Sequence, residues 1–335
     1  MSNILLAGGA GFIGSHLADR FIDSGHKVFC ADKFIMGDGN IERLRLNPNF
    51  VLIHAELADE SQVEKIFELG AVDGGIDAVY HLAANSDIQK GGKEPGIDFN
   101  DTLLTTRALL EGMRTHNVKN LFFASTSAVY GEKDEALNET TGDLRPVSYY
   151  GGCKLASEAL ISSYVSMCDM NAVVFRFPNV IGPRLTHGVI YDFIRKLQKD
   201  NTKLEILGNG KQCKPYIYVH DLVEAIVKLT DSFYNCENPK DKKDNPLAHE
   251  EIYNLSIEGV GTTVTRIAEI VVEEMGLSNV AFNYTGGDRG WKGDVPKFEY
   301  DISKALSTGW KPKYSSEEAV RQSVRDAING AAKRT

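Results

Sequence analysis

The sequence predicts an α/β protein built on a doubly wound parallel sheet, followed by a smaller and irregular C-terminal domain. In the first half, short apolar runs alternate with segments of helical periodicity, and this alternation favours a parallel sheet covered on both faces. The runs AVYHLAA (78–84) and NLFFAST (120–126) are almost continuously apolar, which is typical of strands buried on both sides. After about residue 177 the alternation loosens, and glycine and proline interrupt the chain at PNVIGPR (178–184).

Each predicted element of the first half follows from its local pattern, because strands and helices repeat their apolar residues with different periods. The predicted strands are residues 3–7, 27–31, 50–54, 78–82, 120–125 and 172–177, and the predicted helices lie near 12–24, 60–69, 98–116 and 150–168. We therefore expect a first domain over residues 1–177, with a partial return of the chain around 216–256. A second domain is expected mainly over 178–335.

Composition narrows the classes of function. The chain has 335 residues and a net charge of −9, which argues against non-specific binding to nucleic acid or to an anionic membrane. No apolar run approaches the roughly 20 residues of a membrane-spanning helix, and the N-terminus lacks the pattern of a secretory signal. The five cysteines are scattered and lack CxxC spacing, which predicts neither a disulfide framework nor a metal site. We therefore expect a soluble cytoplasmic protein.

A glycine-rich turn follows the first predicted strand. The segment GGAGFIG (8–14) opens a predicted helix, and its glycines allow a tight turn and a close approach of a pyrophosphate to the helix N-terminus. The order of strand, glycines and helix therefore predicts a dinucleotide site. Its expected contact residues are Gly8, Gly11, Phe12, Ile13 and Gly14.

Asp32 ends the second predicted strand, 18 residues beyond Gly14. A carboxylate at this point accepts hydrogen bonds from the ribose hydroxyls of adenosine and repels a 2′-phosphate, which predicts NAD rather than NADP as the cofactor. Lys33 follows it and is expected at the same site. Glu56 and Leu57 come at the end of the third strand, where Glu56 either flanks the adenine or stands in solvent.

Two pairs of residues have the spacing YxxxK, namely Tyr150 with Lys154 and Tyr300 with Lys304. On a helix, residues four apart share a face, so the lysine can act on the tyrosine. Chance alone predicts about one such pair in a chain of this composition, so the spacing by itself decides nothing.

Position distinguishes the two pairs. Tyr150 comes soon after FFASTSAVYG (122–131), a buried strand whose hydroxyl residues lie at the carboxyl edge of the predicted sheet. Ligands of open α/β sheets bind at this edge. Tyr300 follows no such strand. We therefore expect Tyr150 and Lys154 to be the catalytic pair.

These features together resemble the extended short-chain dehydrogenase/reductase family, and within it the nucleotide-sugar epimerases of the UDP-glucose (galactose) 4-epimerase type. The resemblance extends over nearly the whole chain, through ILGNGKQCKPYIYVHDL (206–222) and GWKGDVPKF (290–298). The segments that carry it are the glycine turn, Asp32, HLAA (81–84), Asn100, STSAVYG (125–131), YGGCK (150–154) and PNVIGPR (178–184).

The resemblance implies a Rossmann domain that binds NAD over residues 1–177 and a domain that binds a nucleotide-diphosphate sugar mainly over 178–335. It also implies a homodimer in which the helices near 98–116 and 150–168 pair across a two-fold axis. Further cofactor contacts are implied after the fourth strand and in the next helix, at Leu82, Ala83, Ala84 and Asn100.

The resemblance implies three catalytic residues. Tyr150 takes the proton from a sugar hydroxyl, Lys154 holds the cofactor ribose and lowers the pKa of Tyr150, and Thr126 hydrogen-bonds the developing oxyanion. Ser125 and Ser127 compete with Thr126 for the last role. NAD would take hydride from C4 of the sugar and return it to the opposite face, which gives a 4-epimer.

On the substrate side, the resemblance implies contacts at Asn179 and at two cations. Lys214 stands where the family commonly has an arginine. The later family arginine falls on Trp291, with Arg289 and Lys292 beside it, and Arg289 is the expected contact to the diphosphate. His187 either lines the pocket or lies on the surface.

Three functions fit these residues: a 4-epimerase, a related 4,6-dehydratase or decarboxylase, and a non-catalytic dinucleotide sensor on the same fold. Thr126, Tyr150 and Lys154 weigh against a sensor, which does not need them. Dehydratases of the family usually carry Asp-Glu after the threonine, and decarboxylases commonly a glutamate, whereas here Ser127-Ala128 follows. The epimerase is therefore the expected function, with Asp87 the only nearby carboxylate that could contradict it.

Overall fold

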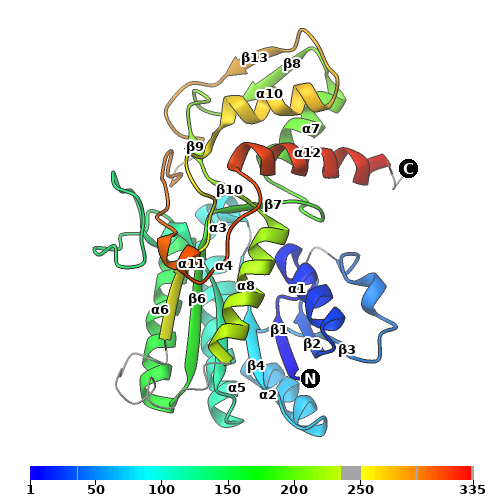
Figure 1. Cartoon of the computed structure of the whole chain (residues 1–335), viewed down its shortest axis with the longest axis vertical. Helices are drawn as coiled ribbons and strands as arrows, with labels where there is room; N and C mark the ends of the chain where they lie inside the picture. Colours follow the sequence, from blue (N-terminus) through cyan, green and yellow to red (C-terminus); the bar gives the residue numbers. More distant parts are fainter. Residues whose placement is uncertain (36, 86, 235–249, 291–292, 333–335) are drawn as a thin grey trace. The chain divides into compact units, whose positions relative to one another are not determined.

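The computed structural model describes residues 1–35, 37–85, 87–234, 250–290 and 293–332 (Figure 1). The chain forms two compact units, each assembled from three separate pieces of sequence. Unit 1 comprises Met1–Val129, Ser148–Arg176 and Ile226–Tyr253, and unit 2 comprises Tyr130–Val147, Phe177–Ala225 and Asn254–Thr335.

Unit 1 contains a seven-stranded sheet in the order β11-β6-β5-β4-β1-β2-β3. Its strands are β1 (Asn3–Ala7), β2 (Lys27–Asp32), β3 (Phe50–His54), β4 (Ala78–His81), β5 (Asn120–Thr126), β6 (Asn171–Phe177) and β11 (Glu250–Asn254). The six strands predicted from periodicity are confirmed to within one residue at each end. Strand β1 pairs in parallel with β2 on one side and β4 on the other, so the strand order reverses between β1 and β4. Ligands of doubly wound sheets bind at such a reversal point.

Helices cover both faces of this sheet, which confirms the predicted fold class. The helices of unit 1 are α1 (Phe12–Asp23), α2 (Glu60–Val72), α3 (Ile88–Lys93), α4 (Pro95–Asp98), α5 (Thr105–Thr115), α6 (Tyr149–Cys168) and the second half of α8 (Val219–Tyr234), with short 3₁₀ turns η1 (Glu42–Leu44) and η3 (Ser127–Val129). The helix predicted near 98–116 is broken, because a π-helical turn, η2 (Phe99–Leu104), lies between α4 and α5.

The two faces of the sheet have separate cores because successive side chains of a strand point to opposite sides. On one face, Phe29 and Phe123 are fully buried with Phe67 of α2, and the buried ring of each contributes about 1.5–3 kcal/mol to stability. Gly112 lets α5 approach α2, since a Cβ there would lie 2.5 Å from the Phe67 ring. On the other face, the hydroxyl of Tyr80 donates a hydrogen bond of 3.0 Å to Thr230 of α8.

Unit 2 is built from small two-stranded sheets and helices. Its strands are β7 (Asn179–Ile181), β8 (Lys203–Ile206), β9 (Cys213–Lys214), β10 (Tyr216–Tyr218), β12 (Thr262–Thr263) and β13 (Ala281–Tyr284), and its helices are α7 (Val189–Lys199), the first half of α8, α10 (Val264–Glu274), α11 (Ser303–Ser307) and α12 (Ser316–Ala332). Strand β10 pairs with β7, β12 with β9 and β13 with β8. The looser pattern of this half of the sequence corresponds to these short elements.

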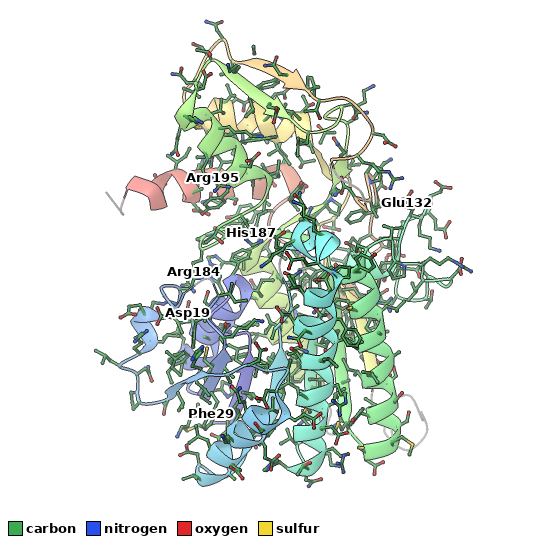
Figure 2. The ribbon with its side chains drawn as sticks, turned by 180° about the vertical axis from the view of Figure 1, so that it is seen from behind. Asp19, Phe29, Glu132, Arg184, His187 and Arg195 are labelled. Carbon is green, nitrogen blue, oxygen red and sulfur yellow. The ribbon has the colours of Figure 1, made fainter. Side chains whose placement is uncertain are left out.

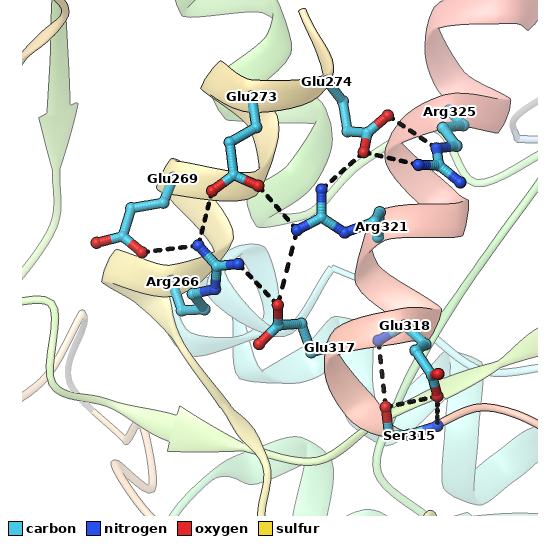
Figure 3. Close-up of polar contacts among 9 residues, drawn as sticks. All are labelled: Arg266, Glu269, Glu273, Glu274, Ser315, Glu317, Glu318, Arg321 and Arg325. Carbon is cyan, nitrogen blue, oxygen red and sulfur yellow. Dashed lines mark hydrogen bonds and ion pairs between the residues drawn. The ribbon is translucent and has the colours of Figure 1, made fainter.

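Helices α10 and α12 of unit 2 are joined by a network of ion pairs (Figure 3). Arg266 donates to Glu273 of its own helix at 2.8 Å and to Glu317 of α12 at 2.7 Å. Arg321 of α12 donates back to Glu273 at 2.8 Å and to Glu274 at 2.7 Å. A single exposed ion pair contributes little to the free energy of unfolding, but a network of shared pairs fixes how α10 and α12 pack.

Residues 130–147 lie within the range predicted for the first domain but pack in unit 2. Leu137 exchanges backbone hydrogen bonds of 2.8 Å with Glu299 and Asp301, and its carbonyl also accepts from the side chain of Asn254 at 2.9 Å. These partners are more than 100 residues distant in the sequence, so local periodicity carries no sign of them.

Candidate active site

The glycine turn is tightly packed at the reversal point of the sheet. Gly8 has a positive φ of 81°, and a Cβ on it would lie 2.6 Å from the backbone nitrogen of Ala83, directly after β4. A Cβ on Gly14 would lie 2.4 Å from the carbonyl oxygen of Gly8. Gly11 is the N-cap of α1 and provides no side-chain cap, so the first turn of the helix, with Phe12 and Ile13, presents its backbone N–H groups. This geometry is a cradle for a pyrophosphate.

Asp32 is held beside this turn at the end of β2. Its carboxylate accepts hydrogen bonds from the backbone nitrogens of Ala10 at 3.1 Å and Phe34 at 2.8 Å. Lys33 forms ion pairs with Asp101 at 2.7 Å and with Glu56 at 3.6 Å. Because these carboxylates engage the Lys33 ammonium, the charge next to Asp32 is already paired, which favours NAD over a cofactor with a 2′-phosphate.

The other predicted cofactor residues lie at the same edge of unit 1. Leu82 donates its backbone N–H to Ala7 at 2.8 Å, and Leu82, Ala83 and Ala84 are half-buried. Leu57 is buried. Asn100 lies on the π-helical turn with an exposed side chain that donates to Asp101 at 3.1 Å.

Tyr150 lies in the first turn of α6, with a half-buried side chain. Ser148 caps this helix and accepts from the backbone nitrogen of Gly151 at 3.1 Å. Burial raises the pKa of Tyr150 to about 12, a hydrogen bond from Thr126 opposes the rise, and the charge of Asp98 adds to it. The structure thus brings the phenol and the Thr126 hydroxyl together.

Lys154 lies one helical turn further along α6 and is 1% exposed. Its ammonium donates to the carbonyl oxygen of Ala124 at 2.6 Å and lies 4.5 Å from the centre of the Phe123 ring. Burial lowers the pKa of Lys154 to about 7, and the charge of Glu158 opposes this shift. A lysine whose pKa lies near neutral pH can change its charge under physiological conditions.

The three hydroxyl residues at the end of β5 have different partners. Ser125 is buried and donates its hydroxyl to the carboxylate of Glu158. Thr126 hydrogen-bonds Tyr150 and accepts from the backbone nitrogen of Ala128 at 3.2 Å. Ser127 begins the 3₁₀ turn η3 and is half-buried. Thr126 is therefore the hydroxyl with a described contact to the phenol.

Sequence reasoning missed two acidic residues near this site. Glu158 is buried and accepts hydrogen bonds from Arg176 of β6 at 3.1 and 2.6 Å. Asp98 is fully buried, and one of its carboxylate oxygens accepts from Asn85 at 2.8 Å. Glu158 could have been identified from the sequence, because it follows Lys154 by four residues and therefore lies on the same helix face.

In unit 2, the two predicted cations meet at one acidic residue. Lys214 forms an ion pair with Asp294, whose other carboxylate oxygen accepts from the backbone nitrogen of Gly290 at 3.1 Å. Arg289 donates to the carbonyl oxygen of Asp294 at 3.0 Å and to both oxygens of Glu132 at 2.6 and 3.1 Å. Glu132 lies on the 130–147 segment and is labelled in Figure 2.

Two further predicted substrate residues lie in unit 2. Asn179 of β7 is exposed and hydrogen-bonds the side chain of Tyr216 on β10. His187 is also exposed, and its ring lies 3.3 Å from the hydroxyl of Thr186 (Figure 2). Trp291 and Lys292 lie outside the described residues.

The model of the NAD-dependent epimerase/dehydratase family matches residues 4–242. A putative UDP-glucose 4-epimerase of Methanocaldococcus jannaschii is 30% identical over 327 residues, which cover 96% of this chain and 97% of that protein. The chain belongs to the NAD-dependent epimerase/dehydratase family.

Two solved structures of UDP-glucose 4-epimerases share this fold. That of Thermotoga maritima, with UDP-glucose, has a TM-score of 0.82 at 30% identity, and that of Thermus thermophilus, with NAD, a TM-score of 0.81 at 27% identity. Each match covers 98% of this chain and 99% of the other. The family is broader than this activity, because other relatives are named UDP-glucuronic acid decarboxylase 1 and dTDP-D-glucose 4,6-dehydratase.

The cofactor of the family is NAD, and the residues of unit 1 fit it. A Cβ on Gly8 or Gly14 would clash with neighbouring backbone atoms, so these positions keep the turn tight and free of larger side chains, and a pyrophosphate can approach the backbone there. Asp32 is fixed at the end of β2, where a carboxylate can accept from ribose hydroxyls. Among the described residues, no helix is long and apolar enough to cross a membrane and no acidic, histidine or cysteine cluster could hold a metal ion.

Proposed function

We propose that the protein is an NAD-dependent 4-epimerase of a nucleotide-diphosphate sugar, of the UDP-glucose/galactose type. The observation that carries this proposal is the residue pair after Thr126. Ser127 and Ala128 begin the 3₁₀ turn η3, and neither can exchange a proton near neutral pH. An oxidised sugar therefore meets no acid or base in this turn that would drive elimination or decarboxylation.

Tyr150 is the proposed base. An unperturbed tyrosine has a pKa near 10, so activity near neutral pH requires a fall of about 3 units, or about 4 kcal/mol, and more from its raised value. The Thr126 hydrogen bond contributes in this direction, and the positive charge of Lys154 on the same helix face supplies attraction for the phenolate. Once the phenolate has taken the sugar's proton, the single O–H of Thr126 would turn to donate to the oxygen on C4, where charge develops. Bound NAD supplies a reversible acceptor for hydride.

Lys214 and Arg289 are the proposed contacts to the substrate diphosphate, and Asn179 and His187 of the same unit are further proposed substrate contacts. Both cations are held by Asp294, which keeps them at fixed positions. Two oxygens of the diphosphate would take the place of the Glu132 carboxylate on the Arg289 guanidinium. Both groups can accept two parallel hydrogen bonds from the two Nη atoms of the arginine.

A second candidate function is a lyase of the same family, either a 4,6-dehydratase or a decarboxylase. Asp98 favours it, because burial raises the pKa of this carboxyl group and its charge acts on Tyr150. Asp87 is less suited to this role, since it is exposed and caps α3 by accepting from Lys90 at 2.9 Å. A sensor that binds NAD without catalysis is the remaining alternative.

One experiment separates these functions. Purified protein is incubated with a panel of nucleotide-diphosphate sugars, and the products are followed by chromatography and NMR, with Tyr150→Phe as the inactive control. We expect interconversion of 4-epimers without net consumption of NAD. Accumulation of a 4-keto-6-deoxy sugar or release of carbon dioxide would show a lyase, and NAD binding without any turnover would show a sensor.

We also propose a cytoplasmic homodimer. Phe99 of η2 and Tyr149 and Met167 of α6 are apolar side chains that are 51%, 56% and 83% exposed, and a partner helix would cover this apolar surface. The described cysteines, Cys30, Cys153, Cys168 and Cys213, are free thiols, as a reducing compartment favours. Light scattering of the purified protein measures the oligomeric state, and a monomer would contradict the dimer.

A further inference from the structure

Two buried charged side chains of unit 1, Glu158 and Arg176, form a row with Lys154 and are not used by the catalytic scheme described above. We propose that Glu158 and Arg176 are positioning residues that together set how firmly Lys154 holds its proton. Glu158 favours the charged ammonium, and Arg176 limits that effect by sharing the same carboxylate. The inference relies on the proposed function only for the catalytic task of Lys154.

The three side chains of the row are shielded from solvent. Lys154, Glu158 and Arg176 are 1%, 5% and 3% exposed. Glu158 follows Lys154 by four residues on α6, so both side chains leave the same helix face. Arg176 of β6 binds Glu158 through two parallel hydrogen bonds, Nε to Oε1 at 3.1 Å and Nη2 to Oε2 at 2.6 Å. Such a paired arrangement fixes orientation as well as charge.

Two adjacent residues of β5 hold the row in place. The ammonium of Lys154 donates to the carbonyl oxygen of Ala124 at 2.6 Å, and the hydroxyl of the next residue, Ser125, donates to Oε1 of Glu158. The amine and the carboxylate are therefore bound to successive positions of one buried strand. They cannot separate without breaking a hydrogen bond to β5, so their mutual effect is built into the fold.

Other groups that face the row do not replace Glu158 as the counter-charge. His81 of β4 is buried, and burial and the charge of Lys154 lower its pKa well below the usual value, so it stays neutral. Glu250 of β11 accepts from Ser162 at 2.7 Å, and burial raises its pKa. Asp98 acts on Tyr150 from α4. Glu158 is the carboxylate whose charge acts on Lys154.

The two proposed partners should therefore move the protonation of Lys154 in opposite directions. Glu158→Gln removes the negative charge and leaves Arg176, so the ammonium becomes less favourable. Arg176→Gln removes the competing cation and leaves Glu158 to act on Lys154 alone, so the ammonium becomes more favourable. A residue pair that only supported packing would loosen the site in both variants, admit water, and shift Lys154 towards the behaviour of an exposed lysine in both.

The titration of Lys154 can be measured directly, without reference to activity, by NMR of protein labelled with ¹³C at the lysine ε-carbon. The signal is assigned by its loss in Lys154→Met. We expect the pKa of Lys154 to fall by about one unit in Glu158→Gln and to rise by about one unit in Arg176→Gln. The matched control is Glu60→Gln, which removes a carboxylate of unit 1 from an exposed pair with Arg107 and should leave the titration unchanged.

Equal signs for the two variants, or no shift in either, would overturn the proposal. If Glu158→Gln does not fold, the double variant Glu158→Gln/Arg176→Gln removes the buried arginine charge together with the carboxylate that binds it, and it should still lower the pKa of Lys154; a rise or no shift would contradict the proposal. Because NMR reports the lysine itself, these results stand whether or not the protein epimerises a sugar. The proposed function is tested separately by the turnover of Tyr150→Phe.

Discussion

The two YxxxK pairs of the chain have the same spacing and quite different structures. Tyr150 and Lys154 both lie in the 20-residue helix α6, and the lysine reaches the backbone of β5. Tyr300 precedes the five-residue helix α11 and forms an isolated β-bridge with Leu137. Only the first pair therefore has the shared helix face that the spacing implies. A four-residue spacing has chemical meaning only where the backbone between its ends is helical.

The surroundings of the two tyrosines also differ, since Tyr150 has polar neighbours and the ring of Tyr300 has aromatic ones. Tyr150 is close to the polar groups of Thr126 and Asp98. The ring of Tyr300 packs edge-on against Tyr130 and Phe298, with ring centres 6.3 and 6.0 Å apart. Apolar packing of this kind stabilises a fold, whereas a hydroxyl partner and a nearby charge tune proton transfer.

The largest expected difference between the pairs is in turnover. Tyr150→Phe should lower kcat by about 10²- to 10⁴-fold with cofactor affinity nearly unchanged, because only the proton acceptor is lost. Tyr300→Phe keeps the ring and should change stability by less than about 1 kcal/mol with turnover intact. Steady-state kinetics of both variants measure the contrast. If Tyr300→Phe is the inactive one, our choice between the pairs is wrong.

The lysines should differ in how their removal affects stability. Because the pKa of Lys154 is lowered to about 7, the unfolded chain binds a proton that the folded chain lacks between pH 7 and about 10.5, so wild-type stability rises with pH there. Lys154→Met removes this dependence. The free energy of unfolding of the variant minus that of the wild type should therefore fall by about 2 kcal/mol between pH 7 and pH 9. Denaturant unfolding measures this, with Lys304→Met as control. If Lys154→Met and Lys304→Met showed the same dependence of stability on pH, the two lysines would not differ in the way we expect.

A smaller effect is expected from the hydroxyl next to Tyr150. Thr126→Val keeps the shape of the side chain and removes a hydrogen bond that lowers the pKa of Tyr150. Activity that depends on the phenolate should then shift to higher pH, with a loss of about tenfold at neutral pH. The pH dependence of kcat/KM measures the shift, and an unchanged profile would argue that Thr126 does not act on Tyr150.

The smallest expected effect concerns the cofactor site that shares unit 1 with the first pair. Asp32→Ala should narrow the preference for NAD over NADP by about fivefold, because the carboxylate no longer repels a 2′-phosphate. Titration of the apo-protein with both cofactors measures this preference. Tighter binding of NADP than NAD by the wild-type protein would show that Asp32 does not select the cofactor.

Local patterns predicted much of unit 1. The glycine turn, six strands and the position of Tyr150 beside β5 could be read from the sequence, because their signals lie within a few residues of one another. The π-helical turn η2 could not, since residues 98–116 keep the periodicity of one continuous helix through it.

Contacts between residues far apart in the sequence could not be predicted from local patterns. Lys214 was identified as a cation for the diphosphate, but its partner Asp294 lies 80 residues further along the chain. Likewise Arg176 is 18 residues from Glu158, on a different element. Such pairs are chosen by the tertiary fold, so a single sequence shows the charges but not their partners.

The edge strand β11 has a consequence for how the protein is made. Unit 1 includes residues up to Tyr253, and β11 covers β6 at the edge of the sheet. At typical rates of synthesis, about 5–20 residues per second, the ribosome needs roughly 13–50 seconds to deliver these residues. Until then β6 has an open edge, and open edges pair readily with other chains. A fragment that ends before β11 would keep the glycine turn and Tyr150 but leave this edge exposed, so the dinucleotide half of the chain cannot be separated from the rest by a simple cut.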